Sequence, residues 1–112
     1  MQQWTDICNT RDILPNSGRA ALHKGRQVAI FRIREGADTH DTFYAVQNFC
    51  PFSEANVLSR GIVGSIGDAV VVASPVYKQH FCLRSGQCIE DESQKLHVWP
   101  VQVNGDRVQL AG

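Results

Sequence analysis

The stretch ASPVYKQHFCLRSGQCI, residues 73–89, contains the pattern of a β-hairpin after a proline-bearing loop. Residues 81–83 and 87–89 are rich in side chains that favour strands. Between them lies RSG, residues 84–86, a three-residue turn in which the glycine supplies the left-handed backbone conformation. This stretch therefore predicts two antiparallel strands joined by a tight turn.

Similar patterns on both sides of this stretch predict more strands. Residues 101–103 and 107–110 flank Asn104-Gly105, a dipeptide that is the strongest short signal for a hairpin. Three more stretches, rich in β-branched or aromatic side chains, are expected to be strands: residues 28–33, 42–46 and 69–73. The last of these is a continuous apolar run, so we expect it to be buried on both faces.

Glycine and proline recur about every 8–12 residues, which is typical of short strands, and no stretch has a long helical period. The chain has 112 residues, a length that suits one domain. We therefore predict a single all-β domain covering residues 1–112, a small sandwich or barrel of antiparallel hairpins. Within it, residues 61–67 (GIVGSIG) are expected to form a pair of turns, and residues 11–14 a single helical turn.

The charge balance and the N-terminus exclude several classes of protein. Lysine plus arginine total 11, as do aspartate plus glutamate, and no basic run occurs, so nucleic acid is not expected as a partner. The N-terminus lacks the pattern of a signal peptide, and no apolar run approaches the about 20 residues that span a bilayer. We expect a cytoplasmic protein without a membrane partner, whose four cysteines are mostly free thiols.

The cysteines and histidines show no spacing typical of a zinc site, since no Cys-x-x-Cys occurs. Cys50, Cys82, Cys88 and His80 could still meet in space as a metal site. The predicted turn would also place Cys82 opposite Cys88, where a cross-strand disulfide is conceivable, although core thiols fit a reducing compartment better. The carboxylates of residues 90–92 (EDE) are expected to lie in a solvated loop.

Two loop sequences together resemble the cluster-binding loops of Rieske iron–sulfur domains. The first is CPF, residues 50–52, and the second is SPVY, residues 74–77, followed by Phe81 and Gly86. In that family the loops read Cys-Pro-His and Cys-Pro-x-His, and a Tyr-Pro-Val-x-Val hairpin closes the domain. Here WPVQV, residues 99–103, stands in the place of that closing hairpin, so the resemblance extends to the end of the chain.

This resemblance implies that the chain has lost the ligands of the cluster. Cys50 keeps its residue type, whereas Phe52, Ser74 and Tyr77 stand where the family has histidine, cysteine and histidine. A Rieske cluster takes two thiolates and two imidazoles, and serine or tyrosine oxygens do not replace them at neutral pH. No cofactor or metal is therefore expected on this chain. Phe52 and Tyr77 are expected to fill the vacated site, and His80 to face solvent or cap the loop.

Two longer phrases, NVLSRG (residues 56–61) and ASPVYKQHFCLRSGQC (residues 73–88), closely resemble the small subunits of bacterial NAD(P)H-dependent assimilatory nitrite reductases. This resemblance implies a large catalytic subunit as partner, which carries FAD, an iron–sulfur cluster and sirohaem. The large subunit transfers electrons from NAD(P)H to nitrite and forms ammonium. The present chain would be a non-catalytic subunit that binds and supports it.

The loop tips of Rieske domains face the electron-transfer partner, so Phe52, Arg60, Tyr77 and Lys78 are candidates for contact with the large subunit. Phe52 and Tyr77 could instead only fill the old cluster cavity. Two other functions remain open at this point. One is a free-standing iron–sulfur electron carrier that uses the rearranged metal site, and the other is an adaptor for a different oxidoreductase.

Overall fold

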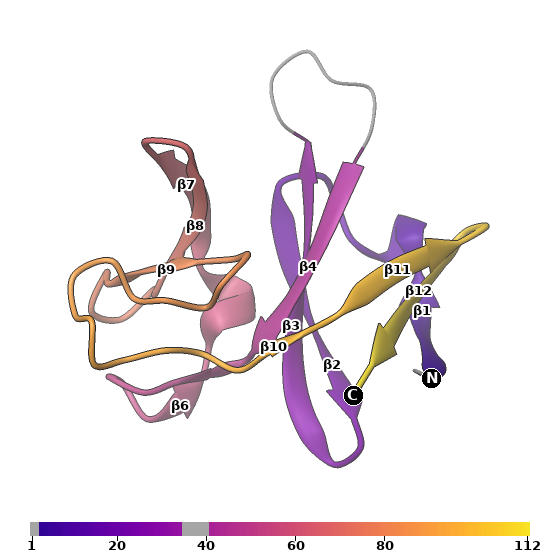
Figure 1. Ribbon diagram of the computed structural model, residues 1–112, viewed down its shortest axis with the longest axis horizontal. Helices are drawn as coiled ribbons and strands as arrows, with labels where there is room; N and C mark the ends of the chain where they lie inside the picture. Colours follow the sequence, from indigo (N-terminus) through magenta and orange to yellow (C-terminus); the bar gives the residue numbers. More distant parts are fainter. Residues whose placement is uncertain (1–2, 35–40) are drawn as a thin grey trace.

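The computed structural model describes residues 3–34 and 41–112 of the chain (Figure 1). Its regular structure consists of strands and of two short 3₁₀ helices, labelled η1 and η2. In chain order the elements are β1 (Trp4–Asn9), η1 (Thr10–Asp12), β2 (Ser17–His23), β3 (Arg26–Arg34), β4 (Asp41–Gln47), β5 (Phe49–Cys50), β6 (Ala55–Asn56), η2 (Leu58–Arg60), β7 (Ile62–Ile66), β8 (Ala69–Ala73), β9 (His80–Cys82), β10 (Val98–Trp99), β11 (Val101–Asn104) and β12 (Arg107–Ala111). Within the described residues, no helix has the length and apolar character needed to cross a membrane.

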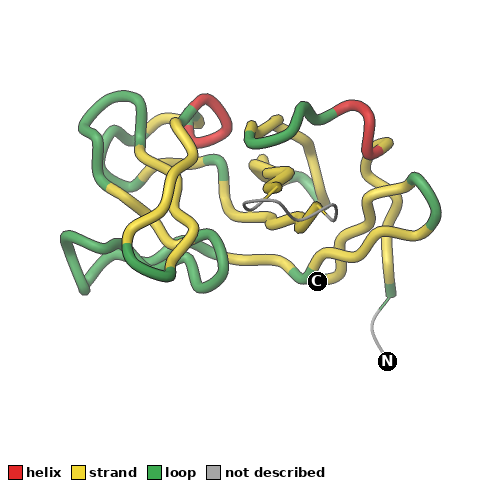
Figure 2. The backbone as a smooth tube through the Cα atoms, turned by 90° about the horizontal axis from the view of Figure 1, so that it is seen from above, coloured by secondary structure: helices red, strands yellow, loops and turns green. Residues whose placement is uncertain are grey.

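The strands form two groups of antiparallel sheets, which confirms the predicted all-β fold. One sheet in the order β1-β12-β11 and another in the order β10-β4-β3-β2 make up what we call the sheet half, residues 3–34, 41–47 and 98–112. The pair β5-β6 and the sheet β7-β8-β9 belong to the loop half, residues 48–97. Figure 2 shows that the C-terminal end of the chain lies on the side of the sheet half.

β3 contributes side chains to both hydrophobic cores of the molecule. Val28 and Ile30 belong to a core between the two sheets of the sheet half. Ala29, Phe31 and Ile33 belong to a second core, shared with the loop half, which also contains Leu58, Val72, Phe81 and Leu83. This alternation follows from the period of two that an extended strand imposes on its side chains. β3 therefore separates the two cores and packs against both halves of the molecule.

Two predicted strand features compare differently with the structure. β8 is buried on both faces at its centre, as predicted, because the adjacent Val71 and Val72 point to opposite faces and both are buried, and β3 is buried over a longer stretch, residues 28–31. Residues 62–66 form β7 instead of a pair of turns, because they pair with β8, and only Gly67 and Asp68 make a turn. The helical turn predicted at residues 11–14 is present as η1, shifted by about one residue.

Both predicted hairpin turns are displaced from the positions that we expected. The closing hairpin turns at Gly105, whose φ of 64° places it in the left-handed region, so Asn104 remains in β11. In the other hairpin, Phe81 and not Cys82 lies opposite Cys88. The turn there is one residue longer than predicted. The premise for a Cys82–Cys88 disulfide, direct opposition across the hairpin, is therefore wrong.

The two halves approach each other closely at Gly18 in β2. A Cβ atom at this position would lie 2.6 Å from a ring carbon of Phe31 and 2.9 Å from the carbonyl oxygen of Ser59. Leu58, next to Ser59 in η2, is fully buried in the shared core. A side chain at position 18 would therefore push the loop half away from the sheet half.

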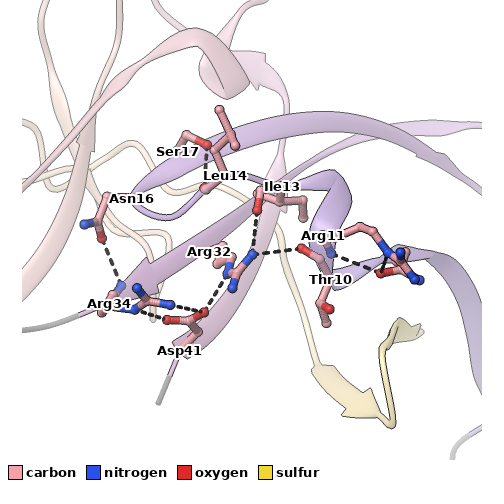
Figure 3. Close-up of polar contacts among 10 residues, drawn as sticks. Thr10, Arg11, Ile13, Leu14, Asn16, Ser17, Arg32, Arg34 and Asp41 are labelled. Atoms are coloured by element: carbon pink, nitrogen blue, oxygen red, sulfur yellow. Dashed lines mark hydrogen bonds and ion pairs between the residues drawn. The ribbon is translucent and has the colours of Figure 1, made fainter. Parts of the chain in front are cut away.

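A polar network holds the end of β3 against β4 and η1 (Figure 3). Arg32 Nε donates to Asp41 Oδ2 over 2.6 Å, and Arg34 Nε donates to Asp41 Oδ1 over 2.8 Å. Arg32 Nη1 also donates to the carbonyl oxygens of Thr10 and Ile13, over 3.2 and 3.0 Å. The hydrogen bonds with Arg34, and then those with Arg32, lower the pKa of the Asp41 carboxyl below its usual range.

Asp41→Asn is expected to lower the free energy of unfolding at neutral pH and to change it little in acid. The pKa of Asp41 is lower in the folded chain than in the unfolded one. Its carboxylate therefore stabilises the fold above the unfolded pKa of about 3.9, and this contribution is lost as the pH falls through the folded pKa. Urea unfolding of the variant and of the unchanged protein, at neutral pH and in acid, measures the difference in the free energy of unfolding.

Asp68→Asn is the matched control, because Asp68 is exposed and forms no hydrogen bond or ion pair with the described part of the chain. It should leave the free energy of unfolding unchanged at both pH values. An equal loss for Asp41→Asn in neutral solution and in acid would contradict the role given to the Arg32–Asp41–Arg34 network.

Gly86→Ala is expected to destabilise the fold by about 2 kcal/mol or more. Gly86 has a φ of 81°, and a Cβ atom there would lie 2.3 Å from the carbonyl oxygen of Leu96. Gly64→Ala is the control, because a Cβ atom at Gly64 meets nothing within 4 Å, and it should change stability by less than about 0.5 kcal/mol. Urea unfolding measures both variants. If their unfolding curves coincide, the close packing at Gly86 does not contribute to stability.

Candidate functional site

Cys50 and Ser74 meet at the base of two neighbouring loops. The first loop, residues 51–54, joins β5 to β6, and the second loop, residues 74–79, joins β8 to β9. The Cys50 thiol donates a hydrogen bond to the Ser74 hydroxyl over 3.5 Å, and both residues are 0% exposed. The two positions that correspond to thiolate ligands in the Rieske pattern thus touch directly.

Ser74 also orders the second loop. Its backbone N–H donates to the carbonyl oxygen of Gln79 over 2.9 Å, and its own carbonyl accepts from the N–H of Lys78 over 3.1 Å. The Ser74 hydroxyl accepts in addition from the N–H of Val76 over 3.4 Å. These bonds close the loop on itself and turn residues 76–78 outward, with Lys78 in the left-handed region at a φ of 65°.

The environment of Cys50 favours its thiolate. Burial raises the pKa of the Cys50 thiol, but hydrogen bonds with the side chain of Ser53, with the Ser74 hydroxyl and with the backbone amides of Ser53 and Phe52 outweigh it, and the pKa falls below its ordinary value. Backbone amides that point at a sulfur are a feature of thiolate sites in general. At Cys50 the first loop therefore keeps the surroundings of a ligand.

Phe52 and Tyr77, which stand at the two histidine positions, have opposite orientations. Phe52 packs against Phe81 with ring centroids 6.0 Å apart, and Phe81 is fully buried in the shared core. Tyr77, in contrast, is 60% exposed. The expectation that both rings fill the vacated site is therefore wrong for Tyr77, because the closed second loop directs its ring into solvent.

His80 joins the second loop to the segment after the hairpin. Its backbone N–H donates to Glu90 Oε1 over 2.7 Å, and its Nδ1 lies 2.6 Å from Glu90 Oε2. Burial alone would raise the pKa of Glu90, but the hydrogen bonds with His80 lower it below its usual range. His80 therefore closes the end of the second loop, and Glu90 does more than line a solvated loop as expected.

The donor atoms at the two loops do not fit a Rieske cluster. Cys50 supplies one thiolate, Ser74 supplies a hydroxyl, and neither Phe52 nor the outward-facing Tyr77 offers an imidazole. The rearranged metal site is not formed either, since no group of three or more His, Cys, Asp or Glu side chains that could hold a metal occurs in residues 3–34 and 41–112. All four cysteines are free thiols, and the Cys88 thiol donates to Glu90 over 3.8 Å.

The tips of the loops instead present an exposed surface of mixed character. Val76 and Tyr77 are 50% and 60% exposed, and Lys78 follows them on the same turn. Arg60 at the end of η2 is exposed as well, and in the described part of the chain neither Arg60 nor Lys78 has an acidic partner. Such a surface, apolar side chains beside unpaired positive charge, is suited to contact with another protein.

Asn48, which no sequence pattern singles out, anchors the segment from β6 to η2 to the sheet half. It is 1% exposed. Its side-chain amide donates to Gln27 Oε1 over 3.0 Å, and its Oδ1 accepts from the backbone N–H of Ser59 over 2.7 Å. Its carbonyl oxygen accepts from the N–H groups of Val57 and Leu58. A lone asparagine between two strands carries no sequence signal for such a role.

Comparisons with known proteins agree with this geometry. A family model described as a Rieske-like [2Fe-2S] domain matches residues 3–111. The "Nitrite reductase (NADH) small subunit" of Salmonella typhimurium is 44% identical over 112 residues, which is 100% of both chains. The NMR structure of the Escherichia coli protein NirD, 43% identical, superposes with a TM-score of 0.87 over 100% of this chain and 98% of that one.

A third relative has a different architecture. The "Nitrite reductase [NAD(P)H] large subunit" of Klebsiella oxytoca is 40% identical over 105 residues, which are 94% of this chain but 10% of that one. A domain of this kind therefore also occurs inside a much longer polypeptide. With its match to the family model over residues 3–111 and to the Salmonella protein over the full length of both chains, the present chain belongs to the Rieske-like family, in the branch of the nitrite reductase small subunits.

Proposed function

We propose that this chain is the non-catalytic small subunit of an assimilatory NAD(P)H-dependent nitrite reductase, and that it binds and supports the large catalytic subunit, which reduces nitrite to ammonium. The observation that carries the proposal is the retention of both loops in a domain whose cluster ligands are replaced. The loops are held by Cys50, Ser74, Phe52 and Phe81, and they end in an exposed surface. The electron-carrier alternative has no such support, because no group of side chains that could hold a metal is assembled among the described residues.

The Klebsiella relative supports an association with the large subunit. Two domains that are separate chains in one organism and parts of one chain in another are held together in the fused form, because a covalent link raises their effective concentration. In that relative a domain 40% identical to this chain is part of a polypeptide named as the large subunit. The same contact would be made between separate chains here.

The redox groups of the complex belong to the large subunit in this proposal. FAD, an iron–sulfur cluster and sirohaem would transfer the electrons there, and the small subunit would carry no cofactor. Its contribution would be structural, through Phe52, Arg60, Tyr77 and Lys78 at the loop tips. Phe52 would support the surface from below, and the other three would touch the partner. The complex would act in the cytoplasm.

Reversing the charge of Arg60 and Lys78 together, as Arg60→Glu with Lys78→Glu, should slow association with the large subunit roughly tenfold and reduce its dependence on salt, because exposed charges at an interface act mainly on the rate of encounter. Association of the purified subunits on a biosensor surface, at low and high salt, measures both effects. Lys24→Glu is the control, since Lys24 lies in the β2–β3 turn of the sheet half. Unchanged association of the double variant would place the docking surface elsewhere.

A further inference from the structure

We infer that the outer edge of β7 pairs with an extended segment of the large subunit, which adds a fourth strand to the sheet β7-β8-β9. This inference rests on the proposed function and specifies how the partner is bound. In Figure 1, β7 and β8 stand at the upper left, on the outer side of the loop half. β7 is the edge strand of its sheet, so one row of its backbone N–H and C=O groups faces away from β8.

The side chains of β7 leave this edge unprotected. Natural edge strands usually carry charged residues, proline or a bulge, which prevent other strands from pairing with them. The sequence of β7, IVGSI, has no charge and no proline, and its register with β8 is regular over all five pairs. Ile62 and Ile66 are 69% and 42% exposed. A strand of this kind is expected to be covered in the functional assembly.

No element of the described chain covers the outer edge of β7. Within residues 3–34 and 41–112, every backbone hydrogen bond of residues 62–66 belongs to the pairing with β8. The opposite edge of the same sheet differs, because Phe81 in β9 is bridged to Cys88 and the N–H of Cys82 donates to Gln87. The sheet is thus closed on one side and open on the other.

A groove between the β7–β8 hairpin and the sheet half borders one face of β7 and offers room for side chains of an added strand. It has a volume of about 500 Å³, and its lining includes Val63 and Ser65 of β7, Val70 of β8, and Asn16, Ile33 and Arg34 of the sheet half. Gly64, in the middle of β7, has nothing within 4 Å of the position of a Cβ atom. An incoming segment could therefore place alternate side chains in the groove and against Ile62 and Ile66, as in the recognition of peptides by strand addition.

The partner at this edge is the large subunit because the edge continues the docking surface. Ile62 pairs with Ala73, which directly precedes the second loop, and Arg60 lies two residues before Ile62. An added strand would therefore pass from β7 onto the surface formed by Arg60, Tyr77 and Lys78. The unpaired positive charges at that end favour a segment with apolar residues along β7 and an acidic residue near Arg60.

A second copy of this chain is the competing occupant. An antiparallel pairing of two β7 strands centred on Gly64 would align Ile62 with Ile66 and bring Arg60 toward Asp68. A stable interface, however, buries about 1,200 Å² or more, and the pairing of two five-residue strands alone provides little of this area. The large subunit can contact the loop tips as well as the edge of β7, whereas the symmetric pairing involves only the edge.

Hydrogen–deuterium exchange of the intact two-subunit complex, compared with the small subunit alone, tests the inference directly. The amides of residues 62–66 that face away from β8 should exchange at least about tenfold more slowly in the complex, because they become hydrogen-bonded. If the complex forms and these amides exchange as fast as in the free chain, the inference is wrong and the proposed function stands. If no complex forms, both are wrong.

Ile62→Lys is the matching variant, and Leu22→Lys in β2 is its control, since both side chains are 69% exposed. Ile62→Lys should weaken binding of the large subunit roughly tenfold, which corresponds to about 1.4 kcal/mol, while Leu22→Lys should not. The free chains should unfold at the same urea concentration. Protection of residues 62–66 that grows with the concentration of the small subunit alone, with a doubled mass, would assign the edge to a second copy and overturn the inference.

Discussion

The contact between the Cys50 thiol and the Ser74 hydroxyl joins two loops that are 24 residues apart in the chain. In the Rieske pattern a metal cluster connects these loops, whereas here the connection consists of this contact and the packing of Phe52 on Phe81. The Ser74 hydroxyl also bonds the N–H of Val76. The same residue that joins the loops therefore directs the second loop outward, and with it the surface that we assign to the partner.

This arrangement depends on the sheet half for its position. The side chains of β3 alternate between the two cores, so the strand that forms the centre of one half also supports the other. The buried Asn48 fixes the start of η2 through Gln27 and Ser59, and Gly18 allows η2 to approach β2 closely. Residues remote from the loop tips thus set the shape of the docking surface without touching it.

The sequence predicts the hairpins because their strands alternate and their turns contain glycine, and the loop motifs predict the Rieske-like arrangement. The sequence does not predict β1 and β2, because their polar and apolar residues do not alternate regularly. It also does not predict β7, because Gly61, Gly64, Ser65 and Gly67 in and around it are residues typical of turns. The role of Asn48 follows from side-chain hydrogen bonds to Gln27 and Ser59, and the outward orientation of Tyr77 follows from the hydrogen bonds that Ser74 makes within the second loop. Such contacts leave no mark on a local pattern.

The small subunit is, in this account, a cluster domain that has kept its loops as a binding surface and has left electron transfer to its partner. The most direct test is the visible spectrum and iron content of the complex isolated through the tagged small subunit from its host grown on nitrite. The account predicts flavin and sirohaem absorption that leaves with a second, larger polypeptide when the complex is dissociated, and a colourless small subunit. Iron and colour that stay with the small subunit would contradict it.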